Sequence, residues 1–507
     1  MLIPGGAAIG IGGVVYTIDK YAYSSLLTRS VRALYVLLWI AYAYSNTDKY
    51  DNLNDLHEVA AESLLQMFTT NKGLYIKLGQ GIANQGSIFP MAFQKRFPQL
   101  YDSAPQEPWS NVEKMLKKNL GQDYETEVFE YISHQPIASA SIAQVHKAKL
   151  KNGTEVAVKI QHGYIEKQII VDLSIHHLMT KVFSKVFDLP LTMFTKYIAD
   201  QIAKETNFIT EMANSERLKK YIAEDSSMRS SNVYIPKNYR ATEQVLITEW
   251  IDGHSLSDKE VLLNAGLDLG VIMKQYLGVF GKQIFKYGWI HSDPHPGNLM
   301  ARFDSRGKQQ LVILDHGLYV ELPEEFRLEY CNLWRYLFLV NSKGILEIAK
   351  EWGIGSPDIF ASFVQLRPVL LDNRTNDIEK DSRGFHNVFQ ELIGDESKFP
   401  LELMFLGRTM RMIQNLNQSF GSPVNRINLL TKELIDALVY EKPNSLVNYI
   451  ELLTIKATLF VSDILFYFLR FKQILSGDRY GGKGKGLEDY LEKYMQNTAK
   501  SMGIEMA

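Results

Sequence analysis

Cysteine is almost absent from this sequence of 507 residues, which contains only Cys331. A single cysteine cannot form a disulfide within the chain, and it cannot build a thiolate zinc site alone. Its surroundings, "EYCNLWRYLF", are typical of a helix that packs into a core. We therefore expect Cys331 to be a buried packing residue and not a nucleophile.

An excess of charge of one sign is also absent. Lysine and arginine total 55 while aspartate and glutamate total 57, which gives a net charge of −2. A chain without a basic field is not expected to bind nucleic acid. Its 46% apolar residues are typical of a folded globular protein. Because the chain is too long for one compact core, we expect roughly two to four structural units.

Long uncharged runs are few. The run from Leu2 to Ile18 carries no charge but contains five glycines, so it is a borderline membrane span. The apolar block from Ala33 to Tyr44 is too short to cross a bilayer alone. The balance of charges around these blocks is mildly cationic, which is compatible with organelle targeting. Two interpretations stay open: a targeting or membrane-associated segment, and a helix buried against the domain.

A third apolar stretch lies near the end of the sequence, at residues 450–471. It differs from a membrane span because it carries Glu451, Lys456, Asp463 and Arg470. These charges favour a buried or amphipathic helix over a second membrane crossing.

The periodicity of apolar residues predicts a mixed α and β chain. Helical spacing dominates residues 51–127, 165–222 (with a break near 188–190) and the part beyond Pro323. Alternation at residues 142–161, with Asn152-Gly153 in the middle, predicts a β-hairpin. A short strand is expected at residues 245–250, before a joint at Asp252-Gly253, and "NLMARF" and "QLVILD" predict two more strands around a polar turn.

Several residues have the types and order that phosphoryl transfer on a kinase frame needs. Lys159, in "VAVK" on the hairpin, is the candidate lysine for nucleotide phosphates. In "HSDPHPGN", Asp293 and Asn298 have the spacing of a kinase catalytic loop. Asp315 precedes His316-Gly317 at the end of a predicted strand, where a metal-binding aspartate would stand. Each residue alone could simply end a turn or a strand, but the ordered set favours the phosphotransfer interpretation.

The same loop invites a zinc interpretation, because His291 and His295 are four residues apart. Pro294 and Pro296 disfavour it, since a regular helix cannot pass through them and the two imidazoles need not converge. A rigid catalytic loop is the preferred hypothesis.

A carboxylate partner for Lys159 is expected on the segment "KETNFITEMANSERL", which starts at Lys204. If this segment is one continuous helix, Asn207, Glu211 and Asn214 share a face and Glu205 points away from it. Glu211 is therefore the predicted ion-pair partner. The alternative is a solvated, charged helix face.

Five stretches together resemble the UbiB/aarF-domain family of atypical kinases, near its mitochondrial aarF-domain kinase branch. They are "IKLGQGIANQ", "PIASASIAQVHKAKLKNGTEVAVKIQHG", "ETNFITEMAN", "HSDPHPGNLM" and "LDHGLY". The resemblance implies an α+β, two-lobed kinase-like fold with a small N-lobe that contains the β-hairpin, a helical C-lobe and added terminal helices. It implies a regulatory extension that carries a KxGQ motif at Lys77, Gly79 and Gln80 and folds over the cleft where a protein kinase admits its peptide.

The resemblance also implies roles for single residues. Asp293, Lys159 and Glu211 match the catalytic set, and Asn298 and Asp315 match the Mg²⁺ ligands. The residues expected to contact ATP or ADP are Lys159, Asn298, Asp315, Glu249 and the alanine-rich loop Ala138, Ser139, Ala140 and Ser141. The family's ExD motif appears as Glu205-Thr206-Asn207, so an amide replaces one carboxylate.

From these observations we predict four segments: a targeting or membrane-associated part (1–50), a helical KxGQ extension (51–135), an N-lobe (136–252), and a C-lobe with a C-terminal extension (253–507). The expected function is a Mg²⁺-dependent ATPase or phosphotransferase in a small-molecule or lipid-linked process, namely coenzyme Q or membrane lipid homeostasis. The alternative is a catalytically weak, nucleotide-gated regulator or scaffold. The resemblance implies an association with mitochondrial membranes, most simply the inner one, and with a membrane lipid or an isoprenoid quinone.

Overall fold

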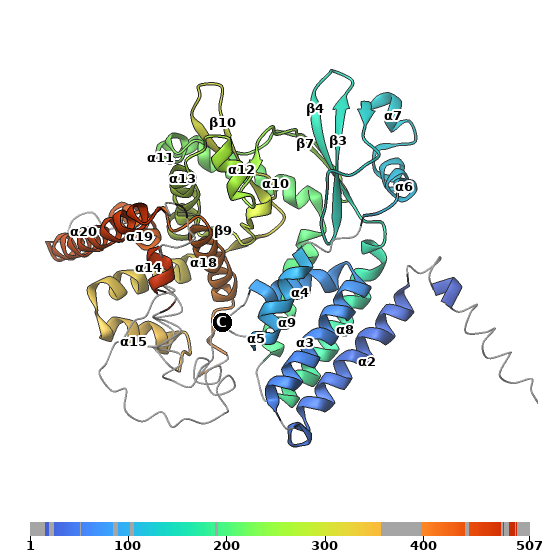
Figure 1. Cartoon of the computed structure of the whole chain (residues 1–507), viewed down its shortest axis with the longest axis horizontal. Coiled ribbons are helices and arrows are strands. Elements are labelled where there is room, and N and C mark those ends of the chain that lie inside the picture. Colours follow the sequence, from blue (N-terminus) through green and yellow to red (C-terminus); the bar gives the residue numbers. More distant parts are fainter. Residues whose placement is uncertain are drawn as a thin grey trace, which may run out of the picture. The chain divides into compact units, whose positions relative to one another are not determined.

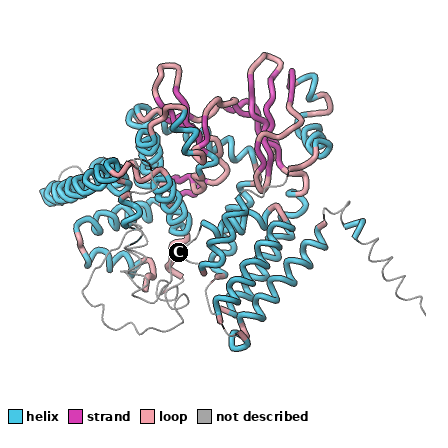
Figure 2. Tube along the Cα trace, viewed as in Figure 1, coloured by secondary structure: helices cyan, strands magenta, loops and turns pink. Residues whose placement is uncertain are grey.

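The chain forms two compact units in the computed structural model (Figure 1). The first unit comprises residues 1–210 and 237–250, and the second comprises residues 211–236 and 251–506. Each has its own sheet and its own helices (Figure 2). The structure describes residues 16–19, 25–50, 52–84, 90–101, 106–187, 191–355, 395, 397–441, 446–477, 480, 486–491 and 493.

The first unit contains a helical part. Its elements are α2 (Leu26–Tyr44), α3 (Leu53–Asn71), α4 (Leu74–Asn84), α5 (Met91–Arg96), η3 (Phe97–Tyr101), α8 (Ile165–Val186) and α9 (Thr192–Glu205). Residues such as Ala33, Ala60, Ile76 and Phe97 are fully buried and form one apolar core, because the apolar positions of each helix recur every three or four residues.

The first unit also contains a six-stranded antiparallel sheet. Its strands are β1 (Phe129–Ile132), β2 (Ala138–Ser139), β3 (Ala143–Leu150), β4 (Glu155–Gln161), β6 (Asn238–Ala241) and β7 (Val245–Glu249), in the order β1-β3-β4-β7-β6 with β2 on β3. α6 (Trp109–Leu120) and α7 (Tyr124–Glu127) complete the unit. Val112 and Leu116 of α6 share a core with Val156, Val158 and Ile160 of β4. The predicted hairpin at 142–161 is therefore confirmed as β3 and β4.

The second unit is mostly helical. Its helices are α10 (Phe208–Glu224, which starts in the first unit), α11 (Ser226–Ser230), α12 (Lys259–Asn264), α13 (Leu269–Lys282), η4 (Gln283–Tyr287), η5 (Pro296–Asn298), α14 (Glu324–Leu339), α15 (Ser342–Glu351), α18 (Glu402–Ser419), α19 (Arg426–Glu441) and α20 (Leu446–Leu475). Its strands are β5 (Val233–Tyr234), β8 (His254–Ser255), β9 (Trp289–His291), β10 (Leu299–Phe303), β11 (Gln309–Ile313) and β12 (Tyr319–Glu321). They form a sheet of order β5-β11-β10-β8 and a β12-β9 ribbon.

Several predictions from the sequence pattern are confirmed. Strands β7, β10 and β11 occur where they were expected, the described residues beyond Pro323 are almost entirely helical, and Cys331 is buried in α14. The division into four segments stays a prediction. Most of the uncharged run from Leu2 to Ile18 lies outside the described residues.

Two helical predictions need correction. The block expected at 33–44 is the second half of α2, which at 19 residues is long and apolar enough to cross a membrane, although core helices of soluble proteins also meet that criterion. The stretch at 450–471 lies in α20, and only 17% of its most apolar window is buried, so the expectation of a buried helix is wrong. The amphipathic alternative stays a prediction.

Gly79 of α4 is fixed by close packing. A Cβ at this position would lie 2.2 Å from Leu100 Cδ1 and 2.7 Å from Phe68 Cδ2, so α4 can approach α3 and η3 only because the side chain is absent. Gly278 of α13 differs, since a Cβ there would meet only Glu433 Oε1 at 3.8 Å.

We predict that Gly79→Ala lowers the free energy of unfolding by about 1–3 kcal/mol, because it overpacks a fully formed core. The control Gly278→Ala should be neutral or stabilising by up to about 1 kcal/mol, since alanine favours helix and has room. Thermal or denaturant unfolding of both variants measures this difference. Equal effects at the two positions would contradict the packing role of Gly79.

Candidate functional site

Asn298 and Asp315 lie at the ends of two paired strands. β10 and β11 are antiparallel, with Leu299 opposite Ile313, and Leu314 N donates a 2.9 Å hydrogen bond to Asn298 O. The register therefore places Asn298, in η5, beside Leu314, the residue that precedes Asp315. A residue with an amide side chain and one with a carboxylate thus stand at the same end of the sheet.

His291 connects Asp293 to Asp315. It lies on β9 and is fully buried. Its Nε2 donates to Asp315 O at 2.8 Å, while its Nδ1 accepts from Asp293 N at 3.1 Å. These two bonds require a neutral ring with the proton on Nε2. Burial also lowers the pKa of His291, which agrees with that state.

The rest of the catalytic-loop candidate is held by short local bonds. Asn298 N donates to His295 O at 2.8 Å, and Gly297 N donates to the His295 Nδ1 at 3.1 Å. Tyr276 OH donates to Pro294 O at 3.1 Å from the buried face of α13. His295 therefore shapes the loop from within, whereas His291 acts from a strand, and the two histidines have separate partners.

Arg408 of α18 pairs with Asp293. Its Nη2 lies 2.8 Å from Asp293 Oδ1, and both side chains are largely shielded from solvent. The two residues are 115 positions apart, and Arg408 stands in an ordinary amphipathic helix. Sequence reasoning missed Arg408 because no motif surrounds it.

Helix α10 holds the turn that follows Asp315. Asn214 Nδ2 donates to His316 O at 2.9 Å, and His316 N lies 3.5 Å from Glu211 Oε1. Gly317 N donates to Asp315 Oδ1 at 2.9 Å, and a Cβ on Gly317 would lie 3.9 Å from Glu211 Oε2. The side chain of Glu211 is buried, with 2% of the residue exposed. It lies close to the Asp315-His316-Gly317 turn.

Lys159 is on the central strand β4 of the first unit. It is opposite Val145 of β3 and Leu246 of β7, and its ammonium lies over the Phe208 ring, 5.1 Å from the centroid. Lys159 and Glu211 belong to different units, so their ion pair stays a prediction. Glu249 ends β7, and its Oε2 accepts from Lys237 N at 3.1 Å.

The alanine-rich loop is anchored by a histidine that the sequence did not single out. Ala138 and Ser139 pair with β3, and Ala140 N donates to Ala143 O at 2.7 Å. His162 Nε2 donates to Ala140 O at 3.0 Å, and burial lowers the pKa of His162, which favours the neutral ring. The loop is therefore tied down at its centre.

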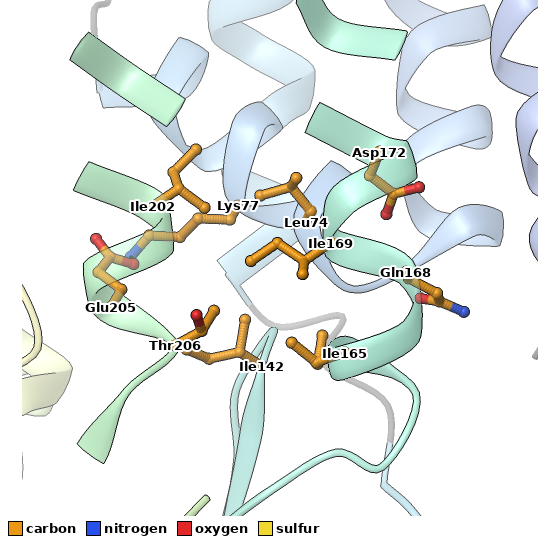
Figure 3. Close-up of a pocket in the computed structure, with 10 residues that line it drawn as sticks. All are labelled: Leu74, Lys77, Ile142, Ile165, Gln168, Ile169, Asp172, Ile202, Glu205 and Thr206. Atoms are coloured by element: carbon orange, nitrogen blue, oxygen red, sulfur yellow. The ribbon is translucent and has the colours of Figure 1, made fainter. Parts of the chain in front are cut away.

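Lys77 of the KxGQ motif forms an ion pair with Glu205 of the ExN motif. Their side chains meet at 3.0 Å, and both are mostly buried (Figure 3). The pair closes one side of a narrow apolar pocket in the first unit, which is lined by Leu74, Ile142, Ile165, Ile169 and Ile202. Gln80 Nε2 donates to Leu100 O at 3.1 Å, so Gln80 secures the motif to η3.

The prediction that Lys204 to Leu218 is one helix is wrong. α9 ends at Glu205 and α10 begins at Phe208, so the angular comparison of Glu205 with Glu211 does not hold. Asn207 lies at the break, and its Oδ1 accepts from Ile209 N at 2.9 Å. Its amide thus serves as a helix cap, a task that asparagine and aspartate perform about equally well.

Comparison with known proteins shows the family of the chain. The model of the ABC1 atypical kinase-like domain matches residues 99–349. An ABC1 family protein of Schizosaccharomyces pombe is 36% identical over 453 residues, which cover 86% of this chain and 83% of that protein. The chain belongs to the ABC1 family of atypical kinase-like proteins. The predicted UbiB/aarF resemblance is thereby confirmed.

Other relatives are named AarF domain-containing kinases. AarF domain-containing protein kinase 1 of Xenopus laevis is 28% identical and covers 82% of each chain. AarF domain-containing kinase 1 of Drosophila melanogaster is 33% identical over 62% of this chain and 60% of its own length. Among solved structures, the complex of Rv3197 with erythromycin from Mycobacterium tuberculosis matches with a TM-score of 0.44, at 22% identity, over 72% of this chain and 96% of that chain.

The predicted site residues fall into two groups. The second unit brings together Asp293, Asn298, Asp315 and Glu211 around β9, β11 and α10. The first unit carries Lys159, Glu249, the alanine-rich loop and the Lys77-Glu205 pair. The fold is two-lobed, kinase-like and α+β, as the ABC1 membership implies.

The second-unit group suits a hard cation. Asn298 and Asp315 offer one amide and one carboxylate oxygen, and Mg²⁺ commonly takes one or two protein carboxylates with phosphates and water as its other ligands. No cluster of three or more His, Cys, Asp or Glu side chains occurs among the described residues as a metal site. The donor set therefore fits a Mg²⁺ ion that a nucleotide brings with it better than a self-contained protein metal site.

The buried histidines give a prediction about pH. Burial, together with the neighbouring His291, lowers the pKa of His316 to about 3. The folded state then stays neutral while the unfolded chain, with a histidine pKa near 6.5, takes up a proton. Stability is fully present above about pH 6.5 and falls with acidification by up to about 1.4 kcal/mol per pH unit for this residue.

We predict that His316→Gln shows a smaller loss of thermal stability between pH 7.5 and pH 5.5 than the intact chain. Substitution of the exposed His254 by Gln is the control and should leave the loss unchanged. An identical loss in all three proteins would contradict a buried, neutral His316.

Proposed function

We propose that this ABC1-family chain is a Mg²⁺-dependent nucleotide-binding enzyme that hydrolyses ATP or transfers its phosphoryl group. The observation that supports this most is the buried His291, which fixes Asp293 and Asp315 relative to each other through two hydrogen bonds. A catalytic carboxylate and a metal-binding carboxylate need such a fixed separation.

The proposed roles follow from the chemistry of each side chain. Asn298 and Asp315 hold Mg²⁺, which neutralises phosphate charge when it is bound. Lys159 contacts the phosphates and Glu211 is its ion-pair partner, while Ala138–Ser141 and Glu249 contact the nucleotide. Asp293 orients the attacking hydroxyl or water and accepts its proton.

Arg408 modifies the proposed role of Asp293. A guanidinium 2.8 Å from the carboxylate stabilises the ionised form, which makes Asp293 a weaker proton acceptor but holds it in one orientation. We therefore expect slow turnover that depends on positioning more than on strong base catalysis.

We further propose a small-molecule or lipid-linked acceptor rather than a general protein substrate. The Lys77-Glu205 pair and the Gln80 bond to Leu100 O hold the KxGQ helix rigidly in its unit, which is compatible with an extension that covers the peptide cleft. Two apolar helices of membrane-spanning length support an association with a membrane, which we place in mitochondria, and a role in coenzyme Q or membrane lipid homeostasis.

A second candidate is a nucleotide-gated regulator or scaffold without productive transfer. The Arg408 ion pair favours it, because an aspartate already engaged by arginine is less available to substrate. In this case nucleotide binding changes conformation, and turnover is incidental.

Asp293→Asn should abolish ATP turnover, with a loss of at least about a hundredfold, because the proton acceptor is removed. Mg-ATP should still stabilise the fold, because the proposed metal ligands Asn298 and Asp315 are unchanged. Coupled phosphate-release and thermal-shift assays measure the two properties. Undiminished turnover would remove Asp293 from its role. Arg408→Gln separates the candidates: reduced turnover with an altered pH profile supports the enzyme, and increased turnover supports the regulator.

The alanine-rich loop yields a second functional prediction. Ala140→Gly should loosen the loop and shift nucleotide preference from ADP towards ATP, because glycine lets backbone amides reach phosphates through conformations that alanine resists. His162→Phe, which removes the bond to Ala140 O, should act in the same direction. Competition binding with ATP and ADP measures the preference. Unchanged ratios in both variants would contradict a restraining loop.

A further inference from the structure

Helix α20 exposes an apolar face of unusual length. Its outward side chains include Phe460, Val461, Tyr467, Phe468 and Phe471, each at least 61% exposed. The helix is labelled in Figure 1. Ile450–Leu475 is long and apolar enough to cross a membrane, and its most apolar 18-residue window has a mean hydropathy of 1.8 with only 17% of that window buried. Contiguous exposed apolar surface of this kind marks an interaction site.

The opposite side of α20 is attached to the second unit. Ile455, Leu459 and Phe466 are buried, at spacings that define one narrow stripe. Asn428 Nδ2 donates to Leu459 O at 2.7 Å, and Gln473 Nε2 donates to Gly421 O at 3.0 Å. The helix therefore lies along the unit and cannot be surrounded by lipid on all sides.

Most of the charged residues that disfavour a membrane crossing in the sequence are turned inward. Glu451 forms an ion pair with Arg335 of α14. Asp463 Oδ1 accepts from Asn425 Nδ2 at 3.3 Å, and Arg470 Nη1 donates to Gly421 O at 3.1 Å. Three of the four charges that the sequence places in residues 450–471 thus have partners within the unit. No carboxylate remains on the outward face of residues 457–471.

Lysines stand at the borders of this face. At about 100° per residue, the outward apolar residues span an arc of roughly 160°, and Lys456 and Lys472 lie at its two edges. Both lysines are exposed. Long cationic side chains at the margins of an apolar face can reach lipid phosphates while the aromatic residues enter the acyl boundary.

We infer that α20 is an interfacial helix that docks the second unit onto an anionic lipid bilayer, lying in its surface. A protein partner fits less well, since protein interfaces carry about one hydrogen bond per 100–200 Å², and the arc from Phe460 to Phe471 offers only the Tyr467 hydroxyl. The inference extends the proposed membrane association to a specific surface, and it does not depend on nucleotide turnover.

Helix α2 of the first unit has the same construction. Leu27, Val31, Tyr35, Leu38 and Tyr42 form an exposed apolar stripe, each at least 50% exposed. Its arginines turn inward, since Arg29 pairs with the buried Asp172 of α8 and Arg32 donates to Asn71 Oδ1 at 2.6 Å. Each of these two helices thus directs several charged side chains toward partners within its unit and exposes an apolar outer stripe.

Flotation of the full chain with lipid vesicles tests the proposal. A variant that combines Phe460→Gln, Phe468→Gln and Phe471→Gln should bind vesicles about tenfold or more weakly, because the aromatic area that would be buried in the bilayer is lost. The matched control combines Val261→Gln, Val271→Gln and Leu346→Gln, exposed apolar positions on α12, α13 and α15, and should bind normally. Lys456→Gln and Lys472→Gln should each cost roughly fivefold, only on vesicles containing anionic phosphatidylglycerol and less at high salt.

A local probe separates α20 from any other membrane contact. An environment-sensitive dye on Phe468→Cys, in a Cys331→Ala background, should shift to the blue with vesicles, whereas the same dye on Leu346→Cys should not. Three results would overturn the proposal. The chain could float without a dye shift at position 468, or the triple aromatic variant could bind vesicles normally. The dye shift could also appear with rising protein concentration alone, which would show that a second copy of the chain covers the face. Stabilisation by Mg-ATP, measured in the same variants, reports folding and nucleotide binding independently of the lipid result.

Discussion

The arrangement of the second unit depends on one neutral imidazole. His291 is buried and accepts from the backbone of Asp293 with one nitrogen while it donates to the backbone of Asp315 with the other. A protonated ring could not accept, so low-dielectric surroundings that keep it neutral also preserve both bonds. The β10-β11 register then places Asn298 beside the same point, and α10 holds the following turn. The positions of the candidate catalytic and metal-binding residues follow from this constraint.

The first unit restrains its own functional segments by related means. His162 bonds to the centre of the alanine-rich loop, and Lys77 and Glu205 join two helices beside an apolar pocket. Gly79 allows the KxGQ helix to approach Phe68 and Leu100 closely. A nucleotide would thus meet a stiff loop and a fixed extension rather than the flexible glycine loop of a typical protein kinase.

Much of this could be predicted from sequence because the decisive signals were local. Alternation and Asn152-Gly153 predicted the hairpin, and the apolar runs around a polar turn predicted β10 and β11, which lie between Asn298 and Asp315. The helix break at Thr206-Asn207 was missed because asparagine capping competes with helical continuity over only two residues. Arg408 and the inward turn of the α20 charges were out of reach, since both depend on contacts far apart in the sequence.

We propose above all that the chain binds a nucleotide together with Mg²⁺ through residues of the kinase type. The most direct measurement is thermal unfolding of the intact chain and of Asp315→Asn with ATP, in the presence and absence of Mg²⁺. The account predicts stabilisation of the intact chain that requires both ATP and Mg²⁺ and that is lost in Asp315→Asn. No stabilisation of the intact chain by Mg-ATP or Mg-ADP would contradict it.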